Sequence, residues 1–137
     1  MSVFIDTSVW FASVVARDRS NASAKTILRG VDRAVTSDHV LVETWTLLAS
    51  RYRPDVAERF WEHLRNGLAD IEIATAADLE AAWAIGSAFH DQDFSLVDRT
   101  SFAIMERLRI TQAASFDHHF AVYRYGRNRD RAFQIMG

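Results

Sequence analysis

Cysteine is absent from this sequence, and proline and lysine each occur only once. Without cysteine the chain has no disulfide, no thiolate metal ligand and no cysteine nucleophile. No apolar run approaches the length that spans a membrane, and the first residues lack the basic segment and long apolar stretch of a secretory signal. We therefore expect a protein of the reducing cytoplasm that does not enter a membrane.

Excess positive charge is lacking as well. The formal net charge is −2 at pH 7, which argues against binding nucleic acid through overall charge. Every cation except Lys25 is an arginine, the side chain suited to bidentate pairing with phosphate or carboxylate. One local cluster could contact phosphates or a partner's acids, but a solvated surface stretch is the favoured interpretation. It consists of Arg124, Arg127, Arg129 and Arg131.

Size and patterning favour one α/β domain over residues 1–137. The chain has 137 residues, of which 49% are hydrophobic, and it contains no repeat or linker that would divide it. Apolar runs typical of strands alternate with stretches of helical spacing, which indicates a three-layer sandwich with a mainly parallel sheet flanked by helices. The expected strands are 2–6, 33–37, 71–75, 112–116 and 132–136, and the expected helices are 7–16, 21–30, 39–52, 55–67, 76–89 and 96–109.

Acidic residues stand where this sheet should end. Asp6 closes the first strand and Asp117 follows the strand that contains "AASF". Asp98 lies at the start of the helix "LVDRTSFAIM". Because the carboxyl ends of parallel strands face one edge, where α/β proteins bind ligands, these carboxylates can converge there.

Glu43 lies inside "HVLVETWTLL", among apolar neighbours. A carboxylate in such a place is costly unless a positive charge compensates it. An arginine such as Arg51 or Arg53 could supply that charge. If Glu43 instead joins the other acids, the usual resolution is a bound cation, and hard oxygen ligands suit Mg²⁺ or Mn²⁺.

Each aspartate also has a purely structural interpretation. Asp6 could cap the helix that follows it. Asp98 could be an acid favoured in the first helical turn by the helix dipole. Asp117 could be a turn residue or the N-cap of "HHFAVY". For each acid taken singly, the structural interpretation is at least as favoured as the functional one. For all of them together the structural interpretation is weaker, because all the acids can share one edge of the sheet.

Other residues that often carry chemistry give weaker signals. His118 and His119 are adjacent, and neighbouring residues on a helix do not face one another, so neither a metal pair nor an acid/base pair is expected. The four tryptophans fall within helical apolar patterns, for which core packing is the better interpretation of most. They are Trp10, Trp45, Trp61 and Trp83.

At four places the sequence resembles the PIN-domain family, and more narrowly the VapC-type toxin ribonucleases of toxin–antitoxin pairs. The stretches are "VFIDTSVW", "LVETWTLL", "LVDRTSFAIMERLRI" and "AASFDHHF". The resemblance implies an acidic quartet of Asp6, Glu43, Asp98 and Asp117. Of these, Asp6, Asp98 and Asp117 are the expected metal ligands, and Glu43 is assigned to a metal-bound water or a second ion. The hydroxyls expected to orient the carboxylates belong to Thr7, Ser8 and Ser115.

The expected function is accordingly a Mg²⁺-dependent endoribonuclease, with Mn²⁺ able to substitute, acting as the toxin of a toxin–antitoxin pair. The resemblance implies an RNA substrate, a cognate antitoxin whose C-terminal segment obstructs the cleft, and often a homodimer. Two alternatives stay open: a catalytically silent PIN-like interaction module and a housekeeping RNA-processing nuclease. The sequence departs from many relatives in the loop "RDRSNASA", where Asn21 stands near an expected histidine, and in a longer C-terminal segment.

Overall fold

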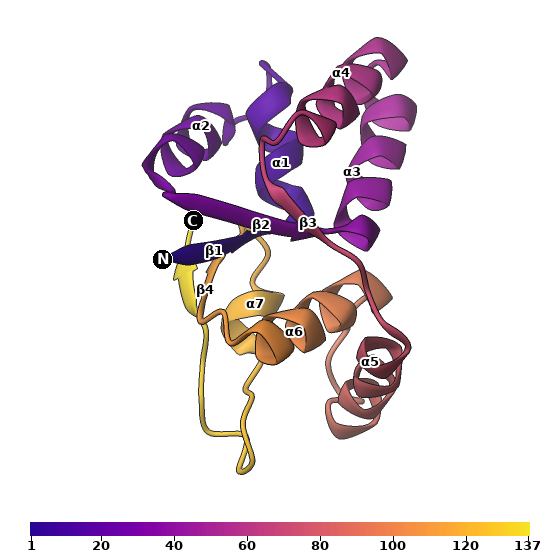
Figure 1. The fold of residues 1–137 in the computed structure, drawn as a ribbon, viewed down its shortest axis with the longest axis vertical. Helices are drawn as coiled ribbons and strands as arrows, with labels where there is room; N and C mark the ends of the chain where they lie inside the picture. Colours follow the sequence, from indigo (N-terminus) through magenta and orange to yellow (C-terminus); the bar gives the residue numbers. More distant parts are fainter.

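The computed structural model describes residues 1–137 and has a five-stranded sheet at its centre (Figure 1). The strands lie in the order β3-β2-β1-β4-β5, and every neighbouring pair is parallel. The expected fold is confirmed, with an entirely parallel sheet. The strands are β1 (Ser2–Ile5), β2 (Arg33–Ser37), β3 (Asp70–Glu72), β4 (Gln112–Ala114) and β5 (Gln134–Met136).

Helices cover both faces of the sheet and complete three layers (Figure 1). One face carries α1 (Thr7–Val14), α2 (Asn21–Gly30), α3 (Asp38–Arg51) and α4 (Pro54–Arg65). The other face carries α5 (Ala76–Ala88), α6 (Leu96–Leu108) and the short α7 (His119–Val122). None of these helices has both the length and the apolar character needed to cross a membrane.

The central strand β1 owes its place to an apolar run without polar alternation. Val3, Phe4 and Ile5 are all buried, as a strand covered by helices on both faces requires. Chain order reverses beside it, because β2 and β3 extend the sheet on one side and β4 and β5 on the other. In open α/β sheets this reversal opens a crevice at the carboxyl ends of the strands.

Several expected boundaries are wrong by a few residues. Helix α1 stops at Val14 because the backbone of Val15 is extended. Strand β3 ends at Glu72, its last residue paired with β2, and the next residues lead into the N-cap of α5 at Thr75. Strand β4 pairs only as far as Ala114, beyond which the chain turns into α7.

An ion-pair network joins β3, α5 and α6. Arg107 on α6 donates two hydrogen bonds to Asp78, of 3.0 and 2.9 Å, and one of 3.0 Å to Glu72. Burial favours protonation of Asp78, but the bonds from Arg107 and the Thr75 amide outweigh it and hold the pKa of Asp78 below its usual range. Asp78 also completes a capping box with Thr75 at the start of α5.

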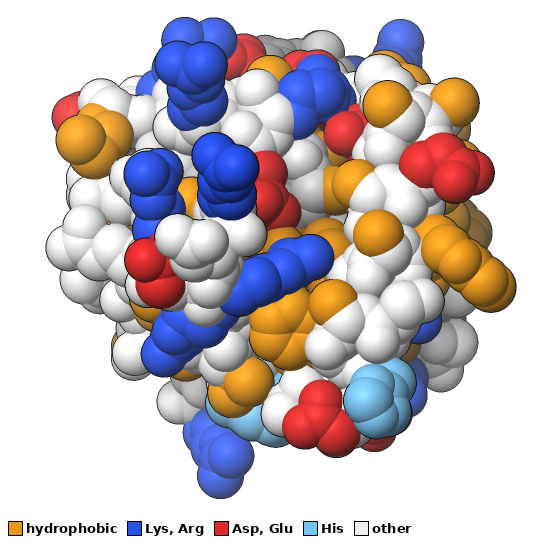
Figure 2. All heavy atoms as spheres, turned by 90° about the horizontal axis from the view of Figure 1, so that it is seen from below, with side chains coloured by type: hydrophobic (Ala, Val, Ile, Leu, Met, Phe, Trp, Pro, Cys, Tyr) orange, Lys and Arg blue, Asp and Glu red, His pale blue; other side chains and the backbone are white.

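The arginine cluster near the C-terminus only partly fits the expected solvated stretch. Figure 2, which looks at the face below the sheet, shows blue side chains gathered on the side of the segment between α7 and β5. Arg129, however, donates to the Tyr123 hydroxyl at 3.0 Å and lies over the Phe89 ring. Arg124 donates to three backbone carbonyls at the end of α7. Arg129 thus packs the segment against Tyr123 and Phe89, and Arg124 caps the C-terminal end of α7.

The expectation of core packing holds for only part of the tryptophan set. Trp10 is buried and donates a hydrogen bond from Nε1 to Thr36 at 3.2 Å, and Trp45 is partly buried against the core. Trp61 and Trp83 are exposed, Trp83 by 74%. Helical spacing identifies the apolar face of a helix, but it does not reveal whether another element covers that face.

Candidate active site

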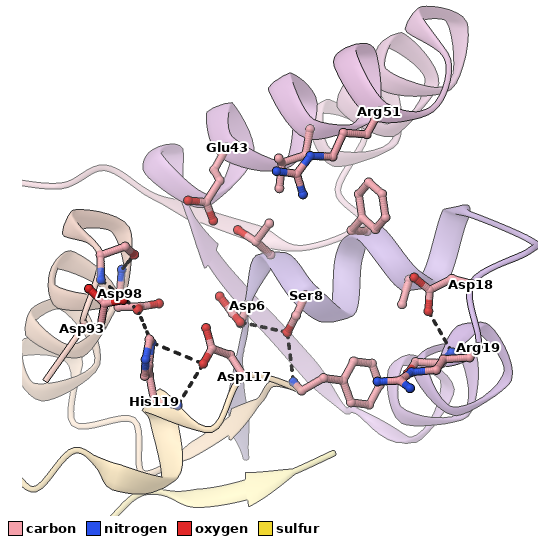
Figure 3. A pocket seen from close by; sticks show the side chains of 17 residues that line it. Asp6, Ser8, Asp18, Arg19, Glu43, Arg51, Asp93, Asp98, Asp117 and His119 are labelled. Atoms are coloured by element: carbon pink, nitrogen blue, oxygen red, sulfur yellow. Dashed lines mark hydrogen bonds and ion pairs between the residues drawn. The ribbon is translucent and has the colours of Figure 1, made fainter.

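The predicted acidic residues border one pocket at the carboxyl edge of the sheet (Figure 3). Its volume is about 550 Å³. It lies where chain order reverses between β1 and β4, at the crevice that this topology creates. Asp6, Glu43, Asp98 and Asp117 all line it, each contributed by a different part of the chain.

Asp6 follows β1 and occupies the N-cap position of α1, but its side chain makes no capping hydrogen bond. The capping interpretation of this carboxylate is therefore wrong. Ser8 and Ser115 instead each donate a hydroxyl hydrogen bond of 2.9 Å to its Oδ2 atom. Asp6 is only 4% exposed. Burial raises its pKa to about 6, with the charge of Asp98 adding to the rise and the two serine hydroxyls opposing it.

The two serines also join the ends of β1 and β4. The Phe116 amide donates to Ser8 Oγ at 2.9 Å, and the Asp117 amide donates to Ser115 Oγ at 3.0 Å. Both hydroxyls thus accept from the backbone after β4 while donating to Asp6. Thr7 differs from them, because its buried Oγ1 has no hydrogen-bond partner within the chain.

Asp98 is the third residue of α6 and belongs to a capping box. The Ser95 amide donates to Asp98 Oδ2, and the Asp98 amide donates to Ser95 Oγ, both at 3.0 Å. His119 Nδ1 lies 2.8 Å from the same carboxylate oxygen. Burial, with the nearby charge of Asp117, raises the pKa of Asp98, although its hydrogen bonds oppose the rise. The structural interpretation of Asp98 is correct, yet the residue also faces the pocket.

Asp117 is half-buried and stands at the turn that starts α7, as its structural interpretation predicts. The His119 amide donates to its Oδ1 atom at 2.9 Å. The His119 ring therefore lies between two acids, 2.8 Å from Asp98 and 3.3 Å from Asp117 (Figure 3). This side chain is only 16% exposed and meets Phe94 edge to face. Sequence reasoning did not assign His119 to the site.

The expectation that His118 and His119 do not face one another is wrong. Their ring centroids are 4.5 Å apart. One nitrogen of His118, one nitrogen of His119 and one carboxylate oxygen of Asp117 all lie within 4.8 Å of one another. His118 is the N-cap residue of α7, and His119 is the first residue of this helix. His118 Nδ1 lies 3.7 Å from Asp117 Oδ1, but its side chain is 79% exposed, whereas His119 is largely buried and also contacts Asp98.

Glu43 reaches the pocket from within α3 and forms no ion pair. Its proposed pairing with an arginine is wrong: Arg53 donates to Asp55 at 3.0 and 2.7 Å, and the guanidinium of Arg51 forms no ion pair. Burial and the charges of Asp98 and Asp117 raise the pKa of Glu43, and the neighbouring Thr7 hydroxyl partly offsets them.

The hydrogen bonds leave a consistent set of acceptor oxygens free. Asp6 Oδ1, Asp98 Oδ1 and Asp117 Oδ2 accept no hydrogen bond, while the second oxygen of each is held by the chain. Carboxylates that lie close together, are buried or partly buried, and have fixed side-chain conformations suit a hard divalent cation. Raised pKa values for Asp6, Glu43 and Asp98 are what such a cluster shows without compensating charge.

The parallel sheet and its cleft of converging carboxylates are typical of α/β enzymes that bind ligands at strand ends. The chain belongs to the PIN-domain family, which it matches over residues 3–125. It is 36% identical to the 23S rRNA-specific endonuclease VapC20 of Mycobacterium tuberculosis over 120 residues, covering 87% of this chain and 92% of VapC20. It is 27% identical to ribonuclease VapC26 of the same organism over 124 residues, covering 89% and 92%.

Solved structures agree with the family. The crystal structure of VapC20 from Mycobacterium tuberculosis, a sarcin-ricin loop cleaving toxin, superposes with a TM-score of 0.81 and 34% identity, covering 85% of this chain and 90% of VapC20. A toxin–antitoxin complex from Klebsiella pneumoniae shares the fold at a TM-score of 0.64 and 13% identity, covering 85% and 87%. The expected resemblance to PIN domains and VapC-type toxin ribonucleases is confirmed.

Proposed function

We propose that this protein is an endoribonuclease of the VapC toxin type, with one nuclease domain over residues 1–137. The observation that carries the proposal is the convergence of four carboxylates, with free oxygens and no ion-pair partner among the arginines, at the crevice beside β1. The relatives support it, because VapC20 and VapC26 are named as an endonuclease and a ribonuclease.

Mg²⁺ is the proposed cofactor, with Mn²⁺ able to substitute. Asp6, Asp98 and Asp117 would hold the ion through their free oxygens, and Glu43 would act through a bound water or a second ion. When bound, such an ion lowers the pKa of water and neutralises charge on a phosphate. Ser8 and Ser115 would fix the Asp6 rotamer, as groups behind metal ligands do. The unpartnered Thr7 hydroxyl lies beside Glu43 and is the third proposed orienting group.

RNA is the proposed substrate, cut at a phosphodiester bond in an unpaired loop, where proteins reach splayed bases. VapC20 is a 23S rRNA-specific, sarcin-ricin loop cleaving toxin, so a ribosomal RNA loop is the first substrate to test here. An antitoxin is the proposed protein partner, and a basic side chain from it would fit the carboxylates. We propose a homodimer from the family resemblance, testable by light scattering of the purified protein.

The test combines cleavage and growth. Purified protein should cut RNA with Mg²⁺ or Mn²⁺ and stop when a chelator is added. Inducing it alone should arrest growth of the host cell. Asp98→Asn should relieve the arrest, because the neutral amide of Asn replaces the negatively charged carboxylate that would hold the ion. Asp91→Asn, at an exposed position between α5 and α6, is the matched control and should remain toxic. A protein that binds a partner but cuts nothing at any metal concentration would be the silent module instead.

The two nuclease alternatives separate by genetic context and by partner. A toxin should lie beside a small antitoxin gene, and its saturated antitoxin complex should no longer cleave RNA. A housekeeping nuclease should tolerate induction without growth arrest. Full activity of the saturated complex would rule out obstruction of the cleft.

A further inference from the structure

Two arginines line the end of the pocket away from the acidic cluster (Figure 3). Arg19 belongs to the loop between α1 and α2, and Arg51 lies in the last turn of α3. Both are exposed, and neither guanidinium forms an ion pair or a hydrogen bond. This distinguishes them from Arg53 and Arg107, whose guanidinium groups are engaged by carboxylates.

The chain holds these two segments together. Arg17 Nη2 donates to the Arg51 carbonyl at 3.4 Å, and the Arg17 guanidinium lies 5.1 Å from the centre of the Tyr52 ring. Asn21 fixes the far end of the loop by donating to the carbonyl of Ala12 at 2.7 Å. The loop is therefore tied to the ends of α1 and α3, and Arg19 and Arg51 reach the same end of the pocket from these two segments (Figure 3).

The charge and volume of the pocket indicate what kind of ligand binds at its arginine end. The pocket is lined by six carboxylates, and the guanidiniums of Arg19 and Arg51 are its only arginine charges. Its volume of about 550 Å³ is in the range of small-molecule sites and far beyond the needs of an ion. A polyanion that enters is repelled by the clustered carboxylates wherever a cation does not neutralise them. At the other end the two guanidinium charges face one carboxylate, that of Asp18, so this end is where the chain itself attracts phosphate (Figure 3).

We propose that Arg19 and Arg51 form a phosphate subsite for the RNA strand, one that binds a backbone phosphate neighbouring the bond that is cut. The inference rests on the proposed function and deepens it. A guanidinium binds phosphate bidentately, and two of them at one end of the pocket set the path of the strand across the acids. Both arginines are positioning residues: they hold the substrate and take no part in bond breaking.

The experiment measures binding apart from cleavage. Arg19→Gln, Arg51→Gln and the double variant are made in the Asp98→Asn background, and their affinity for a labelled single-stranded RNA is measured by fluorescence anisotropy at several salt concentrations. The same substitutions with Asp98 intact give KM and kcat. The matched control is Arg29→Gln, because Arg29 is exposed, unpaired and located where α2 leads to the opposite edge of the sheet. Arg51→Lys tests retention of charge.

The double variant should weaken RNA binding about 10- to 100-fold, in keeping with the loss of charge-assisted hydrogen bonds. The slope of log affinity against log salt should fall by about 0.7 for each phosphate that the variant no longer neutralises. KM should rise while kcat at saturating RNA stays within about threefold, Arg51→Lys should retain part of the affinity, and Arg29→Gln should change nothing.

The failures are distinguishable. Unchanged affinity and salt slope in the double variant, with wild-type cleavage intact, would overturn the subsite and leave the nuclease standing. Equal losses in Arg29→Gln would also overturn it, because they would show a general effect of net charge. A wild-type protein that neither binds nor cuts RNA would refute the proposed function and this inference with it.

Discussion

Replacing Asp6 by Asn should stabilise the metal-free protein at neutral pH. Burial raises the pKa of Asp6 from 3.8 to about 6. At about 1.4 kcal/mol per pKa unit, the ionised carboxylate costs the folded state about 3 kcal/mol. Asn keeps nearly the same shape and an oxygen that can accept from Ser8 and Ser115, so most of that cost should be relieved. We expect Asp6→Asn to be about 1–3 kcal/mol more stable at pH 8 with a chelator.

The pH dependence fixes the sign. Between pH 3.8 and about 6 the folded state holds the Asp6 proton and the unfolded state does not, so the stability of the wild type falls as pH rises through this window. The advantage of Asp6→Asn should therefore be full above pH 6 and shrink toward pH 4. The raised pKa values of Asp98 and Glu43 act in the same direction, but both residues are present in both proteins.

Thermal melts with chelator from pH 4 to pH 8 provide the assay, with a shift of about 3–5 °C expected per kcal/mol for a chain of this size. Asp32→Asn, at an exposed position before β2, is the control and should show no such pH-dependent gain. Adding Mg²⁺ should reverse the order, because binding stabilises the native wild type by about 2.7 kcal/mol at 100 times Kd and Asp6→Asn loses a ligand. A variant less stable than wild type at pH 8 without metal, or one with the full Mg²⁺ response, would refute the reasoning.

Two further substitutions test contacts that the structure adds. His119→Ala should lower kcat/KM about 10- to 100-fold and reduce the Mg²⁺-induced rise in melting temperature, because the ring that lies between Asp98 and Asp117 is removed; unchanged values would show that His119 does not position the acids. Arg107→Ala should lower the free energy of unfolding by about 2–4 kcal/mol in urea titrations, because it leaves the buried Asp78 carboxylate without its ion-pair partner. A loss below about 1 kcal/mol would contradict that account.

The sequence predicted the acidic edge because the relevant information is local. An apolar run followed at once by an acid, as at Ile5 and Asp6, defines both a buried strand and the residue at its end. Parallel order then brings the ends of β1 and β4 together. The serine contacts follow from the same register, since Ser115 stands one residue beyond the last pair between these strands.

The contacts that sequence reasoning missed all depend on packing between distant elements. His119 reaches Asp98 across 21 residues of sequence, and that meeting requires α7 to lie against α6. The freedom of the Arg51 guanidinium could not be predicted either, because Glu43 and Arg51, two turns apart on α3, face the same pocket without pairing. Exposure of Trp83 depends on an absent neighbour, which the pattern along one helix does not describe.

Asp98 shows that one carboxylate can cap a helix and also serve as a ligand in the cleft. A carboxylate has two oxygens, and in Asp98 they are divided between two duties. Oδ2 accepts from the Ser95 amide and lies beside His119 Nδ1, which locks the side chain at the start of α6. Oδ1 accepts nothing from the chain and stays available to the cleft. The capping box therefore orients the acid and leaves its second oxygen free, and a helix N-terminus beside a strand edge is a suitable place for a fixed ligand.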